Sequence, residues 1–163
     1  MTGQAPRTLH PDPRAIDALH RDVPGDRPLA MLNLLRFHEQ AVYPADSDET
    51  PCSGRQAYAR YRRLTLPQLR RVGARPVYRG RVALAFIAPE DEHFDEMFVV
   101  RYPDRAAFER MIAAPGYRAG VQHRSAALAD SRLLVLVDAV AVGRIGWWML
   151  GWIQRLKGSR LSW

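Results

Sequence analysis

The hydrophobic pattern in the first half of the chain predicts a buried strand followed by an amphipathic helix. Residues 29–37 form a short apolar run bounded by Pro28 and an acid-rich loop, and this length favours a buried strand over a helix. Residues 38–51 carry two prolines and three acids, so we expect an exposed, mobile loop. Ser53 is placed to cap the following helix, and Gly73 to end it. The apolar stripe of this helix consists of Tyr58, Tyr61, Thr65, Leu69 and Val72.

The second half predicts a hairpin, two helices and a last strand. Residues 75–88 and 94–102 are expected to be strands joined by a loop at 89–93. Asp104 caps a helix that stops near Pro115, a further helix covers 117–128, and 133–137 form the final strand. The resulting order, β-α-β-β-α-β, predicts an α+β domain of the ferredoxin-like type. Both faces of strand 94–102 carry charge, so one charged side chain must be buried or face a cavity.

Length and composition predict one domain with extensions. The 163 residues are 47% hydrophobic, which suits a single core at residues 28–138. An N-terminal arm covers residues 1–27, with a short helix near 14–20, and a separate segment covers 139–163. Cys52 is the lone cysteine and no secretory signal opens the chain, so we expect a reducing, cytoplasmic location.

The positive charge of the chain is concentrated toward its end. Four basic residues and no acid follow residue 138, and removing these four from the net charge of +7 leaves +3 for the rest. The other arginines sit beside acids or alternate with apolar residues, as on a solvated helix face. Nucleic-acid binding needs a clustered basic stripe, so no nucleic-acid partner is expected.

Several separated motifs resemble a widespread bacterial family of unknown function in the dimeric α/β-barrel superfamily. These motifs are MLNLLRF, AYARYRR, FDEMFVVRYPDRAAFERMI and YRAGVQHRSAALADSRLLVL, and together they span about residues 28–138. The resemblance implies a ferredoxin-like protomer that forms a homodimer through its sheet, with a small-molecule cavity between sheet and helices. Relatives in the superfamily include cofactor-independent oxygenases, haem-degrading enzymes and lactone isomerases, so the fold does not choose an activity. Phe94 stands where the family often has tryptophan.

His123 and Arg124 are the candidate catalytic residues. An imidazole next to a guanidinium has a depressed pKa and can serve as a general base, while Arg124 can hold a carboxylate or enolate oxygen. The structural alternative is a hydrogen bond from His123 to a backbone carbonyl, with Arg124 in an ion pair with Asp130. Both interpretations stay open at this point.

Five further residues are candidates for binding a substrate: Asn33, Tyr58, Tyr61, Asp95 and Arg101. Asn33 interrupts an apolar strand, and a buried amide costs roughly 1–3 kcal/mol unless it is hydrogen-bonded. Its partner is either a ligand or a neighbouring helix or loop. The two tyrosines line either a cavity or an ordinary core. Asp95 and Arg101 lie about 20 Å apart along one strand face, so each needs its own partner.

No cofactor is expected from the sequence. The five histidines show no metal-binding spacing to one another or to Cys52, and no phosphate-binding loop or nucleophile elbow is present in the sequence. Haem bound through His123 is retained as an alternative.

The segment 139–163 predicts an amphipathic helix with an aromatic face. Ile145, Trp148, Met149 and Trp152 follow helical spacing, and basic residues flank them. The apolar run is far shorter than the roughly 20 residues that cross a bilayer. This helix either lies in a membrane interface, placing the protein at the periphery of the inner membrane, or packs on the domain or a partner.

Two functions are therefore expected from the sequence. The first is a small-molecule-binding protein or a cofactor-independent enzyme, oxygenase-like or isomerase-like, that takes an apolar or aromatic acid. The alternative is a non-catalytic module that docks on a membrane or a partner through residues 139–163.

Overall fold

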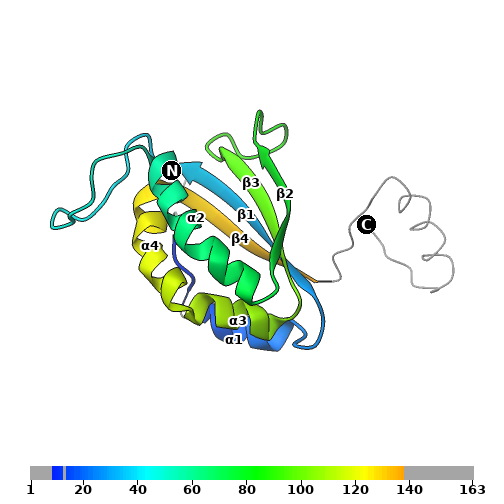
Figure 1. The fold of residues 1–163 in the computed structure, drawn as a ribbon. Helices are drawn as coiled ribbons and strands as arrows, with labels where there is room; N and C mark the ends of the chain where they lie inside the picture. Colours follow the sequence, from blue (N-terminus) through cyan, green and yellow to red (C-terminus); the bar gives the residue numbers. More distant parts are fainter. Residues whose placement is uncertain (1–8, 13, 138–163) are drawn as a thin grey trace.

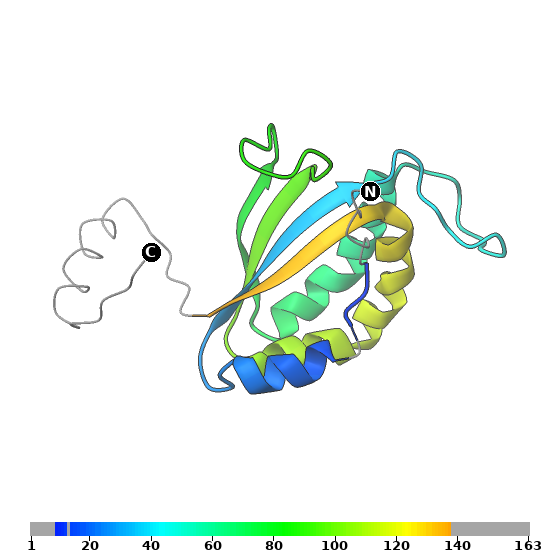
Figure 2. The same ribbon diagram turned by 180° about the vertical axis from the view of Figure 1, so that it is seen from behind.

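The computed structural model describes residues 9–12 and 14–137, and these form one sheet with helices on one of its faces (Figures 1 and 2). The strand order is β2-β3-β1-β4, and each neighbouring pair is antiparallel. This arrangement confirms the predicted α+β, ferredoxin-like fold. The elements are α1 (Ala15–Asp22), β1 (Leu29–Phe37), α2 (Gly54–Arg71), β2 (Arg75–Arg81), β3 (Glu96–Tyr102), α3 (Arg105–Ala113), α4 (Pro115–Ala127) and β4 (Leu128–Val137).

Strand β1 is the centre of the sheet and sets the residues that face the helices. Leu29, Met31 and Leu35 are buried on this inner face, and Asn33 belongs to the same row because side chains alternate along a strand. Leu35 pairs with Glu96 of β3 on one side and with Ser131 of β4 on the other. Glu96, Leu35 and Ser131 therefore form one row across the inner face.

The two long helices follow the sequence signals closely. Ser53 accepts a hydrogen bond from the Gln56 amide, and the Gln56 side chain accepts one from the Ser53 amide, so a capping box starts α2. Gly73 has the positive φ that was predicted for the residue after this helix. Helix α4 crosses α2 at Gly120, where an added Cβ would lie 3.1 Å from Tyr61, so the glycine permits close approach.

Two strand predictions need correction. The second strand ends at Arg81, because β3 begins only at Glu96 and leaves later residues without a partner strand. Phe86 and Ile87 consequently lie exposed in the loop, at 88% and 93%. The last strand begins at Leu128, directly after α4, and not at residue 133. Its first residues include buried polar side chains, so the apolar pattern detected only its second half.

The helix boundaries near the chain centre also shift slightly. Asp104 caps α3 as predicted, because its Oδ1 accepts a hydrogen bond of 2.6 Å from the Ala107 amide. Helix α4 begins at Pro115, where proline is tolerated because the first helical amide has no partner.

The residues that we predict as an amphipathic tail helix lie outside the described part of the chain. Within the described part, no helix is long and apolar enough to cross a membrane.

Candidate functional site

A large cleft lies between the inner face of the sheet and the helices, with a volume of about 1540 Å³. All four strands of the sheet contribute to this cleft, and the two inner strands supply apolar side chains such as Met31 and Phe98. Helices α2 and α4 supply the opposite wall, and α1 with residues 9–12 borders one side. Polar and charged side chains lie among the apolar ones on these walls. They include Asn33, Tyr58, Tyr61, Arg62, Arg79, Glu96, Tyr117 and Arg124.

Three tyrosines form the aromatic part of the helical wall. The ring centroids of Tyr58 and Tyr61 are 5.2 Å apart, and those of Tyr61 and Tyr117 are 6.2 Å apart. Tyr58 is only 3% exposed. Burial raises the pKa of both Tyr58 and Tyr61, so their hydroxyls stay protonated and can donate hydrogen bonds. No described residue forms a hydrogen bond with either hydroxyl.

Arg124 brings a positive charge into this cleft from α4. Its guanidinium donates to the Leu9 carbonyl at 2.5 Å and to the Ser131 hydroxyl at 3.1 Å, and both acceptors are neutral. The alternative of an Arg124–Asp130 ion pair is wrong, because Asp130 binds Arg132 at 2.6 Å. Within the described part of the chain, no carboxylate pairs with Arg124. Among the described residues, the charge of this half-buried guanidinium is therefore uncompensated.

The structure separates His123 from Arg124. His123 is buried but does not line the cleft, since it faces the loop before α2. Its Nδ1 lies 2.9 Å from the Tyr43 hydroxyl, and its Nε2 lies 3.8 Å from Glu49. Arg60 completes this group, at 2.7 Å from Glu49 and 3.4 Å from the Tyr43 hydroxyl. The loop predicted as exposed and mobile is thus fastened to α2 and α4.

The placement of His123 favours a structural contact over the catalytic interpretation. The partner is a tyrosine hydroxyl and not the backbone carbonyl considered as the alternative. Both ring nitrogens face protein groups, so His123 is not positioned to bind haem iron. Among the described residues, no cluster of three or more histidine, cysteine, aspartate or glutamate side chains could hold a metal ion.

Asn33 lines the cleft from the middle of β1. Its Nδ2 donates to the Met31 carbonyl at 3.1 Å, so the amide finds a partner in its own strand. This contact meets the requirement that a buried amide be hydrogen-bonded. The side-chain oxygen has no hydrogen-bond donor among the described residues.

Asp95 and Arg101, the two charged residues proposed for substrate binding, do not line the cleft. Asp95 precedes β3, accepts a hydrogen bond of 2.7 Å from the Phe37 amide and pairs with Arg55 at 3.4 Å. Arg101 lies on the face of β3 opposite the helices and borders a separate small depression. Alternation along the strand therefore directs the neighbouring residue, Glu96, to the cleft.

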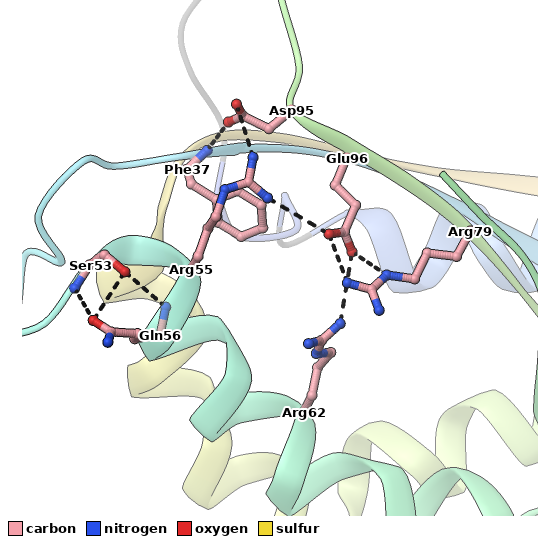
Figure 3. Close-up of polar contacts among 8 residues, drawn as sticks. All are labelled: Phe37, Ser53, Arg55, Gln56, Arg62, Arg79, Asp95 and Glu96. Carbon is pink, nitrogen blue, oxygen red and sulfur yellow. Dashed lines mark hydrogen bonds and ion pairs between the residues drawn. The ribbon is translucent and has the colours of Figure 1, made fainter. Parts of the chain in front are cut away.

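Glu96 is the buried charge that the strand pattern required, and three arginines surround it (Figure 3). Arg79 of β2 binds both carboxylate oxygens, at 2.8 and 2.9 Å. Arg62 and Arg55 approach from α2, each at 3.9 Å. Sequence reasoning missed this group because three arginines from two elements meet only in the folded chain. The alternation of charges in residues 94–102 was the available signal.

Comparison with solved structures supports the chain path described above. The RPA0582 protein of unknown function from Rhodopseudomonas palustris is 38% identical, with a TM-score of 0.75, over 83% of this chain and 100% of that one. Its methylated form is 37% identical, with a TM-score of 0.75, over 85% and 98%. SnoaB, a cofactor-independent oxygenase from Streptomyces nogalater, is 15% identical, with a TM-score of 0.43, over 72% and 99%. A similarity as low as that to SnoaB carries no inference about activity.

Fold and cleft together define a ferredoxin-like α+β protein with a ligand-sized cleft under its sheet. The chain belongs to the family described as Domain of unknown function (DUF1330), whose match covers residues 50–140. This confirms the predicted membership of a family of unknown function. No curated protein matches the chain.

Proposed function

We propose that this protein binds an apolar or aromatic carboxylic acid in the cleft under the sheet. The uncompensated charge of Arg124 is the observation that carries the proposal. A guanidinium in an apolar environment gains most from an anionic partner, and arginine binds carboxylates through two parallel hydrogen bonds. Arg124 is therefore the proposed anchor for the ligand carboxylate.

The tyrosine wall supports an aromatic body for this ligand. Tyr58, Tyr61 and Tyr117 offer ring surfaces against which a planar ligand can pack. The hydroxyls of Tyr58 and Tyr61 and the side-chain oxygen of Asn33 can each form a hydrogen bond with polar groups of the ligand. An apolar cleft with a few convergent polar groups is typical of small-molecule sites.

Binding is the activity that this geometry supports best. His123, the base of the expected enzyme, faces away from the cleft and does not line it. Arg124 alone can orient an acid and stabilise developing negative charge on it. The catalytic role of His123 accordingly receives no support from its position.

We further propose that two protomers associate through the helix-free face of the sheet. This face carries a set of half-exposed apolar residues along its central strands and its β4 edge, and an uncovered patch of this kind favours association. Light scattering coupled to gel filtration should give twice the mass of one chain, whereas a single-chain mass would contradict the dimer. The apolar residues are Leu32, Leu34, Met97, Val99, Leu134 and Leu136.

Calorimetric titration with biphenyl-4-carboxylate tests the binding proposal. We expect saturable binding at one site per chain, weakened at least about tenfold in Arg124→Gln because a charge-assisted hydrogen-bond pair is lost. Arg118→Gln is the matched control, since Arg118 is exposed on the same helix and does not line the cleft. Equal affinity of Arg124→Gln and the wild type, or no binding at all, would refute the proposal.

A further inference from the structure

The group around Glu96 carries more positive than negative charge. Three guanidinium groups, from Arg55, Arg62 and Arg79, face two carboxylates, Asp95 and Glu96. Asp95 pairs with Arg55 at 3.4 Å, and Glu96 accepts two short hydrogen bonds from Arg79. One guanidinium is therefore left without a carboxylate of its own, and Arg62 is that residue.

Arg62 has only a distant ion pair within the described chain. Its Nη1 lies 3.9 Å from Glu96, which is too long for a hydrogen bond, and no described residue accepts a hydrogen bond from it. Figure 3 shows its side chain extending from α2 toward Glu96 and Arg79. Both Arg62 and Arg79 line the cleft. The guanidinium donors of Arg62 are consequently available to a ligand inside the cleft.

The sheet register relates Arg62 to Arg124, the proposed anchor in the cleft. Arg124 binds Ser131, and Ser131, Leu35 and Glu96 form one row across β4, β1 and β3. Neighbouring strands lie about 4.8 Å apart, so Ser131 and Glu96 are separated by roughly 10 Å. Tyr58 packs in the same apolar cluster as Leu35, the residue between them. The cleft thus has a cation at each side of a buried tyrosine.

We infer that Arg62, supported by Arg79 and Glu96, is a second anion-binding subsite, so the ligand is an elongated dianion such as an aromatic dicarboxylate. This inference rests on the proposed function, because it takes Arg124 as the first anchor. Glu96 does not block the subsite, because Arg79 neutralises its carboxylate from the β2 side through two short hydrogen bonds. Its 3.9 Å ion pair with Arg62 leaves the guanidinium donors of Arg62 unbonded among the described residues. A rigid ligand with acidic groups roughly 10 Å apart matches the two strand spacings between the Ser131 side and the Glu96 side of the cleft.

Two related probes separate the second subsite from the first. Biphenyl-4-carboxylate can occupy only one cationic side, whereas biphenyl-4,4′-dicarboxylate can reach both. In calorimetric titrations we expect the dicarboxylate to bind the full-length protein at least about tenfold more tightly than the monocarboxylate. Arg62→Gln should reduce this ratio to near one while leaving the monocarboxylate affinity unchanged, and Arg62→Lys should retain part of the preference.

The matched control is Arg70→Gln, because Arg70 is exposed on the same helix and does not line the cleft. It should leave the affinities for both probes as they are in the wild type. Thermal melting of each variant checks that a lost preference does not reflect a lost fold.

The outcomes distinguish failure of this inference from failure of the proposed function. If the monocarboxylate binds through Arg124 but the dicarboxylate binds no more tightly, the second subsite is wrong and the first stands. If Arg62→Gln weakens both probes equally, Arg62 contributes general charge and not a subsite. If neither probe binds the wild type, the proposed function fails and the second subsite fails with it.

Discussion

Two groups of polar side chains, one behind α4 and one in the cleft, differ in how many of their members find hydrogen-bond or ion-pair partners within the protein. Behind α4, Tyr43, Glu49, Arg60 and His123 contact one another, so each polar group has a partner. In the cleft, the hydroxyl of Tyr58 has no hydrogen-bond partner among the described residues, and Arg124 has no carboxylate. A satisfied polar network stabilises a fold, whereas polar groups in a cleft without protein partners contribute no such stability and are available to water or a ligand. The contrast favours a structural role for the first group and supports the proposed binding role of the second.

Of the changes considered, high pH should lower the stability of the folded protein most. Burial raises the pKa of Tyr58, Tyr61 and Tyr102 above that of an unfolded tyrosine, near 10. Their neutral forms therefore favour the folded state fully below pH 10, and this stability is lost as the pH rises above it. Each tyrosine contributes a slope approaching about 1.4 kcal/mol per pH unit, so the three together approach about 4 kcal/mol.

Urea unfolding at pH values between 9 and 11 measures this slope. Tyr58→Phe should lower it by about one third, because one of the three groups no longer titrates. Tyr78→Phe is the control, since Tyr78 is 59% exposed on β2. An identical slope in the wild type and Tyr58→Phe would show that burial does not perturb Tyr58.

Removing His123 should cost stability without affecting the cleft. His123→Ala opens a cavity behind α4 and leaves the Tyr43 hydroxyl with only its long contact to Arg60, so we expect a loss of about 3 kcal/mol in the free energy of unfolding. Urea titration measures the loss, with His93→Ala as the exposed control. The affinity of His123→Ala for biphenyl-4-carboxylate should match that of the wild type. A large drop in affinity with little loss of stability would instead restore His123 to the binding site.

A pair of tyrosine substitutions gives the smallest but sharpest comparison. Tyr43→Phe removes a partnered hydroxyl and should destabilise the protein by about 1 kcal/mol. Tyr58→Phe removes a hydroxyl without a partner and should change the free energy of unfolding by less than about 0.5 kcal/mol. The same substitution should lower the affinity for biphenyl-4-carboxylate several-fold. Melting temperatures and calorimetric titrations on both variants provide the comparison. The distinction fails if the two substitutions affect stability and affinity alike.

The fold was largely predictable because its local signals agree with its tertiary structure. The apolar run at residues 29–37, the Ser53 cap and the Asp104 cap all lie where the sequence placed them. The start of β4 was missed because buried polar residues such as Asp130 and Ser131 interrupt the apolar pattern there. Such residues are buried with their partners, and those partners are not visible in a periodic pattern.

The candidate site was predicted only in part. Which residues meet depends on how each helix or strand is rotated relative to its neighbours, and the sequence pattern does not specify this. Tyr58, Tyr61, Asn33 and Arg124 line the cleft as hypothesised. His123 lies next to Arg124 on the same helix but points toward the loop before α2, since adjacent helical positions face different directions. Alternation in residues 94–102 indicated a buried charge without specifying the face that the helices cover. The position of the helices selects Glu96 over Asp95.

The close crossing of α2 and α4 at Gly120 determines which wall of the cleft can move. Tyr61 and Thr65 pack directly against Gly120, so the two helices are in close contact there. We expect the backbone amides at this crossing to exchange with solvent only when the whole domain unfolds. Helix α1 is attached through the buried side chain of Leu19 and through the Arg105 guanidinium, which donates to the carbonyls of His20 and Val23. Because Leu19 is the one buried residue of α1, we expect this helix to open locally on a shorter timescale than α2 and α4. Under the proposed function, ligands of different thickness would displace α1, while the tyrosine wall keeps its shape.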